Sequence, residues 1–427
     1  MKERLNKNRR ALLKNTVMLY ILQFSTYLLD LITVPVETRV LSKENFGLIG
    51  VAAGIMLYFQ IVIDFGFILS ATEQVSKNRG NKEMLSRLVT SVTACKLLLT
   101  LVSGTVLFIL CCALTPWRPN TSFYMLYFGA TALNALMPDF LYRGLEQMTA
   151  ITVRAVCIRV FFTGMICAFL HNPDDHYLVP LLQIIGNSIA IIAIYFHMFR
   201  RLKVRFCRIT LRDMGAQLKR ASGFFASRIA SSIYTKSNYI ILSVVGVGSG
   251  MSGMYSASDK AITAAQGCCS PISDSLYPYM VKNHDYKLVK KALMIFMPII
   301  LVGVTVVFIW AEPLCQLVFG AKYAGTGAVL RAMLPIAVVI LPSYICGFPM
   351  LSSMGITKYA NYSIMIGSVV HLLNLAILYF TGNIRNVVLL GAAVSVTETV
   401  ILLVRLWAIW RHRELLKAPA QKETTNE

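Results

Sequence analysis

Long apolar runs alternate with short polar segments along the whole chain. Each run is about 20–28 residues long, enough for a helix to cross a hydrocarbon core of roughly 30 Å. Alternation at period two, the pattern of a transmembrane β-barrel, is missing. The sequence therefore predicts an all-α polytopic membrane protein of about twelve transmembrane helices. The predicted spans are Asn15–Thr38, Asn45–Ser70, Leu88–Leu114, Ser122–Leu141, Ile151–Leu170, Leu178–Phe199, Gly223–Val245, Gly253–Val281, Ala292–Phe319, Gly327–Met350, Ala360–Phe380 and Val387–Trp410, and Pro138 with Asp139 interrupts the inner end of the fourth.

The uneven distribution of Lys and Arg among the loops predicts the orientation of the chain. With the N-terminus inside, the cytoplasmic segments hold 28 of the 41 basic residues, and the external loops hold only five. This asymmetry appears only when the number of spans is even, so that the two terminal segments lie on the same side. We therefore expect both termini to be cytoplasmic. The N-terminal stretch MKERLNKNRRALLK precedes an apolar run that is too long for a signal peptide and has no small-residue cleavage site, so it indicates a retained first span.

Composition agrees with a membrane protein and excludes several other classes. Hydrophobic residues make up 56% of the chain and charged residues only 14%, whereas a soluble domain carries about 25% charged residues. The net charge of +21 follows from the basic cytoplasmic loops, and no soluble basic module is present that could bind nucleic acid. The ten cysteines and six histidines are scattered without ligand spacing, so we expect no metal site.

The only long polar interruption lies close to the centre of the chain and predicts two halves of six spans. Six spans restore the same orientation, so any repeat between the halves must be parallel, related by an axis along the membrane normal. The predicted organisation is an N-terminal six-helix lobe (1–199), a basic cytoplasmic linker (200–222), a C-terminal six-helix lobe (223–410) and a cytoplasmic tail (411–427). The external loops are too short to hold a catalytic domain, so the chain is predicted to be a transporter and not an enzyme.

Three motifs resemble one family of membrane proteins. RVLSKENFGLIGVAAGI followed by DFGFILSATEQVSK is similar to the first-hairpin signature of polysaccharide repeat-unit flippases (Wzx-type), within the multidrug/oligosaccharidyl-lipid/polysaccharide exporter superfamily. SGMYSASDKAITAAQGCCSPISDSLYPYMVK resembles the family's motif at span eight, and LVFGAKYAGTGAVLRAML with MLSSMGITKY resembles its span-nine to span-ten region. The chain departs from related proteins in span seven, where they often have Asp and this sequence has Lys236, Ser237 and Asn238.

The resemblance implies a MATE-like, V-shaped pair of six-helix lobes around a central cavity, working by alternating access. The implied substrate is a lipid-linked oligosaccharide on polyprenyl pyrophosphate, moved to the outer leaflet of a bacterial inner membrane for O-antigen, capsule or exopolysaccharide synthesis. A polysaccharide polymerase complex is an implied partner alongside membrane lipid. A sugar head group cannot cross hydrocarbon unaided, because each unpaired polar group costs several kcal/mol there. Such a protein must therefore provide a polar, preferably cationic path.

Charged residues within spans are costly and usually face a cavity or a partner. The candidate substrate-binding cations are Lys236, Lys260, Arg159, Lys96, Arg154, Arg228 and Arg331. Asp30 and Asp64 are candidates for coupling transport to protons or sodium ions, and no other cofactor is expected. Lys236 and Lys260 fall at similar depth on consecutive spans, which makes them the sharpest candidates for binding a diphosphate.

Structural explanations stand beside each of these roles. Asp259 is placed to neutralise Lys236, and Asp64 lies in a DFG sequence typical of a turn at the end of a span. Asp139 and Arg143 have the spacing of an i,i+4 ion pair, and Arg405 is expected to snorkel toward the cytoplasmic surface.

Two other function classes stay open. A drug or cation exporter of the same superfamily would need an acidic or apolar cavity, which the basic residues within the spans argue against. A membrane polysaccharide polymerase or ligase would need external catalytic loops, which the short loops argue against.

The charge distribution makes a topology prediction. In single-cysteine variants, a membrane-impermeant thiol reagent should label positions Asn120 and Asp174 from outside the cell, and should leave Asn81 and Gln217 unlabelled until the membrane is permeabilised. The reverse labelling pattern would contradict the predicted orientation.

Overall fold

The computed structural model describes residues 2–245 and 250–416, and within these residues all regular structure is helical. Contacts between Cα atoms group the chain into two compact units. Unit 1 comprises residues 1–232 and 239–252, and unit 2 comprises residues 233–238 and 253–427. The predicted external loop Gly246–Ser252 and the predicted tail 411–427 lie partly outside the described residues.

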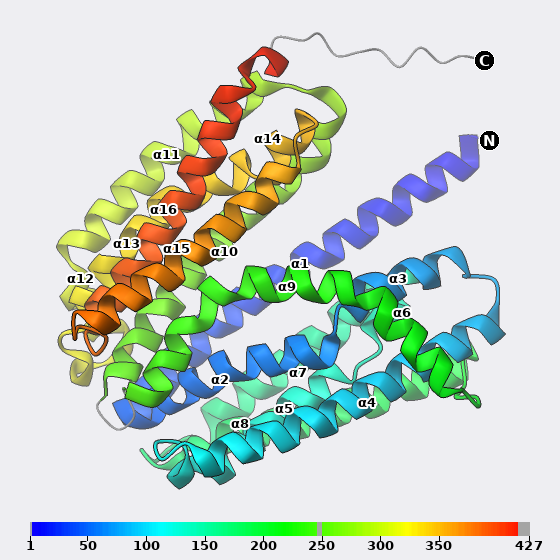
Figure 1. Cartoon of the computed structure of the whole chain (residues 1–427), viewed down its shortest axis with the longest axis horizontal. Helices are drawn as coiled ribbons and strands as arrows, with labels where there is room; N and C mark the ends of the chain where they lie inside the picture. The colour runs from blue at the N-terminus through cyan, green and yellow to red at the C-terminus, as the bar shows by residue number, and fades with distance from the viewer. Residues whose placement is uncertain (1, 246–249, 417–427) are drawn as a thin grey trace. The chain divides into compact units, whose positions relative to one another are not determined.

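Figure 1 shows the helices of both units. Those that begin in unit 1 are α1 Lys2–Val40, α2 Lys43–Asp64, α3 Phe67–Lys77, α4 Lys82–Ala113, α5 Thr121–Ala135, α6 Asp139–Gly144, α7 Met148–Phe169, α8 Leu178–His197, α9 Leu211–Val245 and α10 Met251–Asn283. The rest belong to unit 2: α11 Tyr286–Ile309, α12 Ala311–Phe319, α13 Thr326–Cys346, α14 Phe348–Ser353, α15 Lys358–Phe380 and α16 Val387–Arg411. Short 3-10 turns lie at Arg118–Asn120, Asp175–Tyr177, Ala321–Tyr323 and Arg413–Leu416, and a π-helical turn at Met198–Leu202.

Eight helical segments among the described residues are long and apolar enough to cross a membrane. They are Lys43–Lys77, Lys82–Ala113, Met148–Phe169, Asp175–Leu202, Tyr286–Ile309, Thr326–Ser353, Lys358–Phe380 and Val387–Arg411. The other four predicted spans are also helical, as α1, α5 with α6, α9 and α10. The predicted break in the fourth span is confirmed: α5 ends at Ala135 and α6 begins at Asp139, because Pro138 has no N–H to continue the helix.

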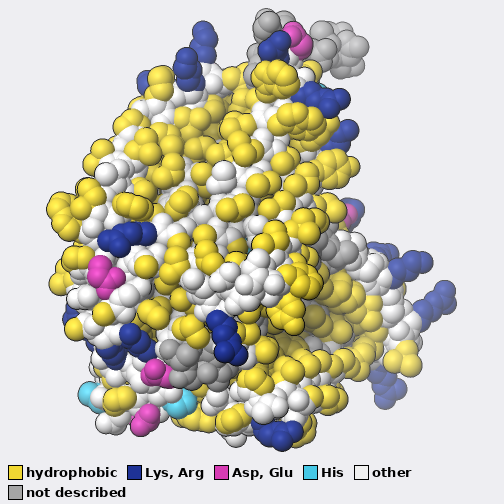
Figure 2. Space-filling view, turned by 60° about the vertical axis from the view of Figure 1, so that its left-hand side comes forward, with side chains coloured by type: hydrophobic (Ala, Val, Ile, Leu, Met, Phe, Trp, Pro, Cys, Tyr) yellow, Lys and Arg dark blue, Asp and Glu magenta, His cyan; other side chains and the backbone are white. Residues whose placement is uncertain are grey.

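Many large hydrophobic side chains lie on the outside of the helices, as expected of a protein surrounded by lipid. In the most apolar stretch of α11 no residue is buried, and Ile299 and Val302 are 64% and 65% exposed. Hydrophobic side chains dominate the face drawn in Figure 2. This surface and the eight segments identify a multi-pass membrane protein.

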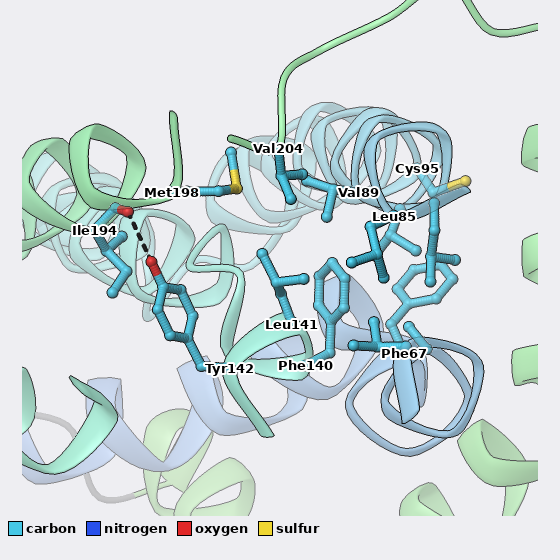
Figure 3. Packing of buried hydrophobic residues seen from close by; sticks show 14 of the residues in the cluster. Phe67, Leu85, Val89, Cys95, Phe140, Leu141, Tyr142, Ile194, Met198 and Val204 are labelled. Carbon is cyan, nitrogen blue, oxygen red and sulfur yellow. Dashed lines mark hydrogen bonds between the residues drawn. The ribbon is translucent and has the colours of Figure 1, made fainter. Parts of the chain in front are cut away.

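In unit 1, α1 packs along α7, α5 packs against α2 and α8, and α3 packs against α6. A core cluster from α3, α4, α6 and α8 holds one end of the unit together, and Phe67, Val89 and Leu141 are fully buried in it. Figure 3 shows this cluster, in which the hydroxyl of Tyr142 donates to the carbonyl of Ile194 at 3.1 Å.

The segment predicted as a basic linker is built into unit 1. Val204 is 1% exposed in the same core cluster, and the N–H of Arg205 donates to Ser86 Oγ at 3.1 Å. The guanidinium of Arg87 on α4 contacts Asp213 at 2.9 Å at the start of α9. Hydrogen bonds from the Thr210 N–H, and then from Arg87, hold the pKa of Asp213 below its usual range. The sequence could not indicate this attachment, which depends on distant residues of α4.

In unit 2, α16 packs between α13 and α15. Glycine permits the close approach of α15 to α16, since a Cβ at Gly367 would meet Ile401 Cγ1 at 2.5 Å. Ser395 Oγ on α16 donates to the carbonyl of Ala332 on α13 at 2.6 Å. Small residues and hydroxyl groups of this kind are typical of contacts between membrane helices.

Gly66 separates α2 from α3 and makes a stability prediction. Its φ is +78°, and a Cβ would meet Phe224 Cβ at 2.8 Å and the carbonyl of Ala221 at 2.9 Å. We expect Gly66→Ala to lower the free energy of unfolding by about 1–3 kcal/mol or more, measured as a lower melting temperature in detergent. Gly215→Ala on α9 is the control, because a Cβ there would meet nothing within 4 Å. Equal melting temperatures for the two variants would contradict the steric argument.

Candidate functional site

Two helix breaks bring charged groups together in unit 1. After Asp64, the last residue of α2, Phe65 and Gly66 both have positive φ and turn the chain into α3. The predicted turn role of the DFG sequence agrees with this geometry. The ring of Phe65 stacks on Phe225 at 4.3 Å between centroids, so the turn is fixed against α9.

Lys96 on α4 joins the two breaks. Its ammonium group donates to Asp64 Oδ1 at 2.9 Å and to the carbonyl of Ala135 at 2.6 Å. The Ala135 carbonyl is the last of α5, and because the helix ends before Pro138 it has no intrahelical partner. Lys96 is 4% exposed and Asp64 7%. A buried ion pair is retained only when hydrogen bonds satisfy its remaining groups, and here the freed carbonyl supplies one.

A small polar cavity of about 110 Å³ lies beside this pair. It is lined by Gln60, Asp64, Ile68, Lys96, Asn134, Ala135, Met137, Asp139, Phe140 and Arg228. Its volume suits several water molecules or a small polar group, and it cannot hold a sugar chain. The cavity therefore brings together three of the predicted site residues: Asp64, Lys96 and Arg228.

Arg154 on α7 adds a further positive charge to this cluster. Its guanidinium forms a two-pronged ion pair with Asp139, with NH2 donating to Oδ2 at 3.0 Å. Lys96 and Arg154 are thus paired with Asp64 and Asp139, and Arg228 is a third basic residue, which lines the cavity with Asp64 and Lys96.

The predicted i,i+4 pair of Asp139 with Arg143 was wrong. Among the described residues no ion pair joins them, and Asp139 instead pairs with Arg154. The reason is that α6 is only six residues long, so its carboxylate at the N-terminal end is within reach of the neighbouring helix α7.

Arg159 and Asp30, both predicted as site residues, contact one another between α7 and α1 at 2.8 Å. Their side chains are 40% and 42% exposed, so the pair is open on one side. Thr33 and Thr163 on the same two helices share a hydrogen bond of 2.9 Å. Asp30 therefore has a basic partner in this structure, as does Asp64.

In unit 2, the ammonium group of Lys236 contacts Asp259 Oδ2 at 2.9 Å, as the structural explanation of this residue anticipated. Nearby on α9, the amide of Asn238 donates to the hydroxyl of Tyr255 at 2.9 Å and to the carbonyl of Leu390 at 3.0 Å. Lys260, the residue after Asp259, is exposed and forms no ion pair within the described part of the chain. The two lysines that sequence placed at similar depth therefore have different surroundings.

Arg331 on α13 binds the end of α11. Its Nε donates to the carbonyl of Phe308 at 2.9 Å, and its guanidinium lies 5.9 Å from the centroid of the Phe308 ring. Cations are favourable at a helix C-terminus, where carbonyl groups lack partners. In this structure Arg331 therefore caps α11.

The prediction that Arg405 snorkels to the surface was wrong. Arg405 is 7% exposed, its Nε donates to Ser363 Oγ at 3.0 Å, and its NH1 donates to the carbonyl of Ser343 at 2.6 Å. A Cβ at Gly347 would lie 3.0 Å from Arg405 NH1, so glycine leaves room for the guanidinium. Glu398, about two turns earlier on α16, is buried as well and contacts the hydroxyl of Tyr234.

Sequence reasoning missed this polar network of unit 2. The sequence did contain a signal, because Ser343 on α13 and Ser363 on α15 lie within apolar spans. Their partner, Arg405, can be identified only from the packing of α16 against these helices.

Comparisons with known proteins cover nearly the whole chain. A family profile described as "Polysaccharide biosynthesis protein" matches residues 12–284. The chain is 27% identical over 405 residues to the "Putative O-antigen transporter" of Shigella dysenteriae, covering 93% of this chain and 99% of that protein. It is 25% identical over 426 residues to the protein of the same name from Escherichia coli K12, covering 96% and 100%.

Two solved structures share the fold. One is an inward-facing multidrug resistance MATE family transporter of the MOP superfamily, with TM-score 0.64 and 16% identity over 95% of this chain and 100% of that one. The other is the lipid II flippase MurJ in an inward closed conformation, with TM-score 0.62 and 14% identity over 95% and 90%. At these identities the similarity shows the fold alone.

The buried pair of unit 1 makes a prediction about stability. Lys96→Met leaves the Asp64 carboxylate buried without its ammonium partner, so we expect it to cost about 3 kcal/mol of unfolding free energy. Asp64→Leu with Lys96→Met removes both charges and should recover most of that loss. Melting in detergent measures both.

Lys77→Met is the matched control, because its pair with Glu73 is 70% and 57% exposed and should contribute less than about 1 kcal/mol. If the double variant Asp64→Leu with Lys96→Met loses as much unfolding free energy as the two single variants together, the two charges are not coupled.

Proposed function

Since the chain belongs to the polysaccharide biosynthesis protein family, we propose that it moves polyprenyl-pyrophosphate-linked oligosaccharide repeat units across the bacterial inner membrane. The product would supply O-antigen or a related surface polysaccharide. Two relatives named as O-antigen transporters, each matched over almost its full length, support this substrate class. The chain is a membrane transporter and not an enzyme, as its relatives named as O-antigen transporters indicate.

The observation that carries the proposal is the charged cluster of unit 1. Lys96 and Arg228 line a polar cavity together with the carboxylates of Asp64 and Asp139, and Arg154 on α7 pairs with Asp139. A site built with three basic side chains suits an anionic head group better than the cations that many drug exporters carry. Basic side chains form strong charge-assisted hydrogen bonds with phosphate oxygens.

The pairing of these cations supports a specific mechanism. A diphosphate that reaches Lys96 or Arg159 competes with the carboxylate that each now contacts, Asp64 or Asp30. A carboxylate that loses its partner in a low-dielectric site is costly as an anion, so it binds a proton or a sodium ion. Exchange of partners would thus link cargo binding to the proton or sodium occupancy of the carboxylate.

In this proposal, both termini and the segment 200–222 lie in the cytoplasm. A polysaccharide polymerase uses the transported repeat unit in the next reaction. The basic loops support this orientation.

Complementation tests the function. In a bacterial strain whose own O-antigen transporter gene is deleted, the chain should restore surface O-antigen when a matching lipid-linked repeat unit is synthesised. Resistance to cationic drugs should stay unchanged in the same cells. Drug resistance without restored O-antigen would contradict the proposal and favour a drug exporter.

Lys260 gives a sharper prediction within the same assay. Because it is exposed and forms no ion pair within the described residues, Lys260→Gln should leave the protein level and melting temperature unchanged. It should reduce surface O-antigen at least about tenfold, as expected when one charge-assisted contact of roughly 1.5–3 kcal/mol is lost. Lys260→Arg should retain most of the export.

Arg385→Gln, in an exposed turn before α16, is the control and should export normally. Normal export by Lys260→Gln would remove Lys260 from the transport path.

A further inference from the structure

An open groove of about 990 Å³ runs between α7 and α8 in unit 1, on helices that lie side by side. One end is closed, because Gly186 on α8 lets that helix approach Ile158 and Phe161 on α7. Beyond this contact α8 presents Ala190 and Ala193, whose small side chains leave the space between the helices unfilled. Val153 and Ile189, which also line the groove, are 54% and 58% exposed, so it opens to the outside of the helices.

The length of the groove matches one leaflet of a bilayer. Gly186 and His197 mark its two ends on α8, and eleven residues of helix span roughly 16 Å. Half of a hydrocarbon core of about 30 Å is roughly 15 Å. Apart from Arg154, the walls beyond the polar end are mainly apolar, so the occupant they suit is a hydrocarbon chain of a single leaflet.

The open end of the groove is polar and basic. Glu146 and His197 line it, and Arg154 lines the groove about two turns of α7 further in. Both nearby acids are already paired, Glu146 with Arg79 at 2.6 Å and Asp139 with Arg154. Among the residues that the structure describes, the buried Nε of Arg154 has no hydrogen-bond partner.

Three further cations follow the end of α8: Arg200 and Arg201 lie in the π-helical turn, and Lys203 comes just after it. All three are exposed, and none forms an ion pair within the described residues. Arg200 lies over the ring of Phe196 at 5.7 Å, on the exposed side of the helix end. This end of the groove therefore carries uncompensated positive charge, at the level where a lipid head group would lie.

The geometry points to a binding site for an anionic glycerophospholipid between α7 and α8. The groove takes an acyl chain, and the basic end takes the phosphate of the head group. The positive-inside rule assigns that end to the cytoplasm, so the lipid comes from the cytoplasmic leaflet. The groove is a different cavity from the one beside Lys96, and the Arg154–Asp139 ion pair lies between the two. The inference holds whether or not the cargo is the one proposed above.

Two native cysteines on α7 allow a direct test. Cys157 lines the groove, and Cys167 is exposed on the same helix outside it. The purified full-length protein in detergent is treated with N-ethylmaleimide while dioleoyl-phosphatidylglycerol or dioleoyl-phosphatidylcholine is titrated in. Peptide mass spectrometry follows each cysteine. Phosphatidylglycerol should slow the modification of Cys157 at least fivefold, phosphatidylcholine less than twofold, and Cys167 should react equally in both.

Variants separate the groove from its basic end. Ala193→Phe fills the groove and should abolish protection by phosphatidylglycerol, whereas Ala168→Phe, at an exposed position of α7 outside the groove, should leave it intact. The double variant Arg200→Gln with Arg201→Gln keeps the groove. It should raise the phosphatidylglycerol concentration needed for half-maximal protection of Cys157 by about tenfold. This second variant tests the site even where Ala193→Phe does not fold.

Three outcomes would overturn the inference. Equal protection by both lipids would show that the site does not recognise an anionic head group. Absence of protection at Cys157 would show that no lipid binds in the groove. Stronger protection by a polyprenyl phosphate than by phosphatidylglycerol would assign the groove to an isoprenoid chain instead.

Discussion

Charged side chains inside apolar helices constrain this structure more than any other group, because hydrocarbon offers them no water. Lys96 is held by Asp64 and by a carbonyl of α5, Lys236 by Asp259, and Arg405 by serines of α13 and α15. Each of these interactions joins different helices, so satisfying the charge also fixes how the helices pack. An apolar interface could slide without such a penalty, whereas a displaced ammonium group would lose its partners outright.

Interruptions of the helices provide some of the partners that these buried charged groups need. The turn at Phe65 and Gly66 ends α2 at Asp64, and Pro138 ends α5 so that the Ala135 carbonyl is free to accept. A continuous helix would have used that carbonyl in its own backbone ladder. The polar cavity of unit 1 therefore follows from sequence features that break helices, with the charges placed at the breaks.

The helices and their breaks could be predicted from the sequence, whereas the partners of the charged side chains could not. Apolar run length predicts the helices, and Pro138 with the DFG sequence predicts two of their ends, because each signal lies in neighbouring residues. Partners of charged groups could not be predicted in the same way. The i,i+4 rule selected Arg143 for Asp139, but the short α6 directs the carboxylate to Arg154 of α7. Arg405 was expected to snorkel to the surface, whereas serines of other helices hold it inside.

Pairing of the candidate cations is compatible with a role in transport. A lysine buried alone would bind an anion tightly and release it slowly, and it would destabilise the empty protein. A lysine that already holds a carboxylate binds a diphosphate only by exchange, so breaking the ion pair offsets much of the free energy of binding the diphosphate. Binding then stays weak enough for release on the other side, and the carboxylate set free is left to take up a cation. On the proposed function, Asp64 beside Lys96 and Asp30 beside Arg159 therefore contribute to turnover as well as to stability.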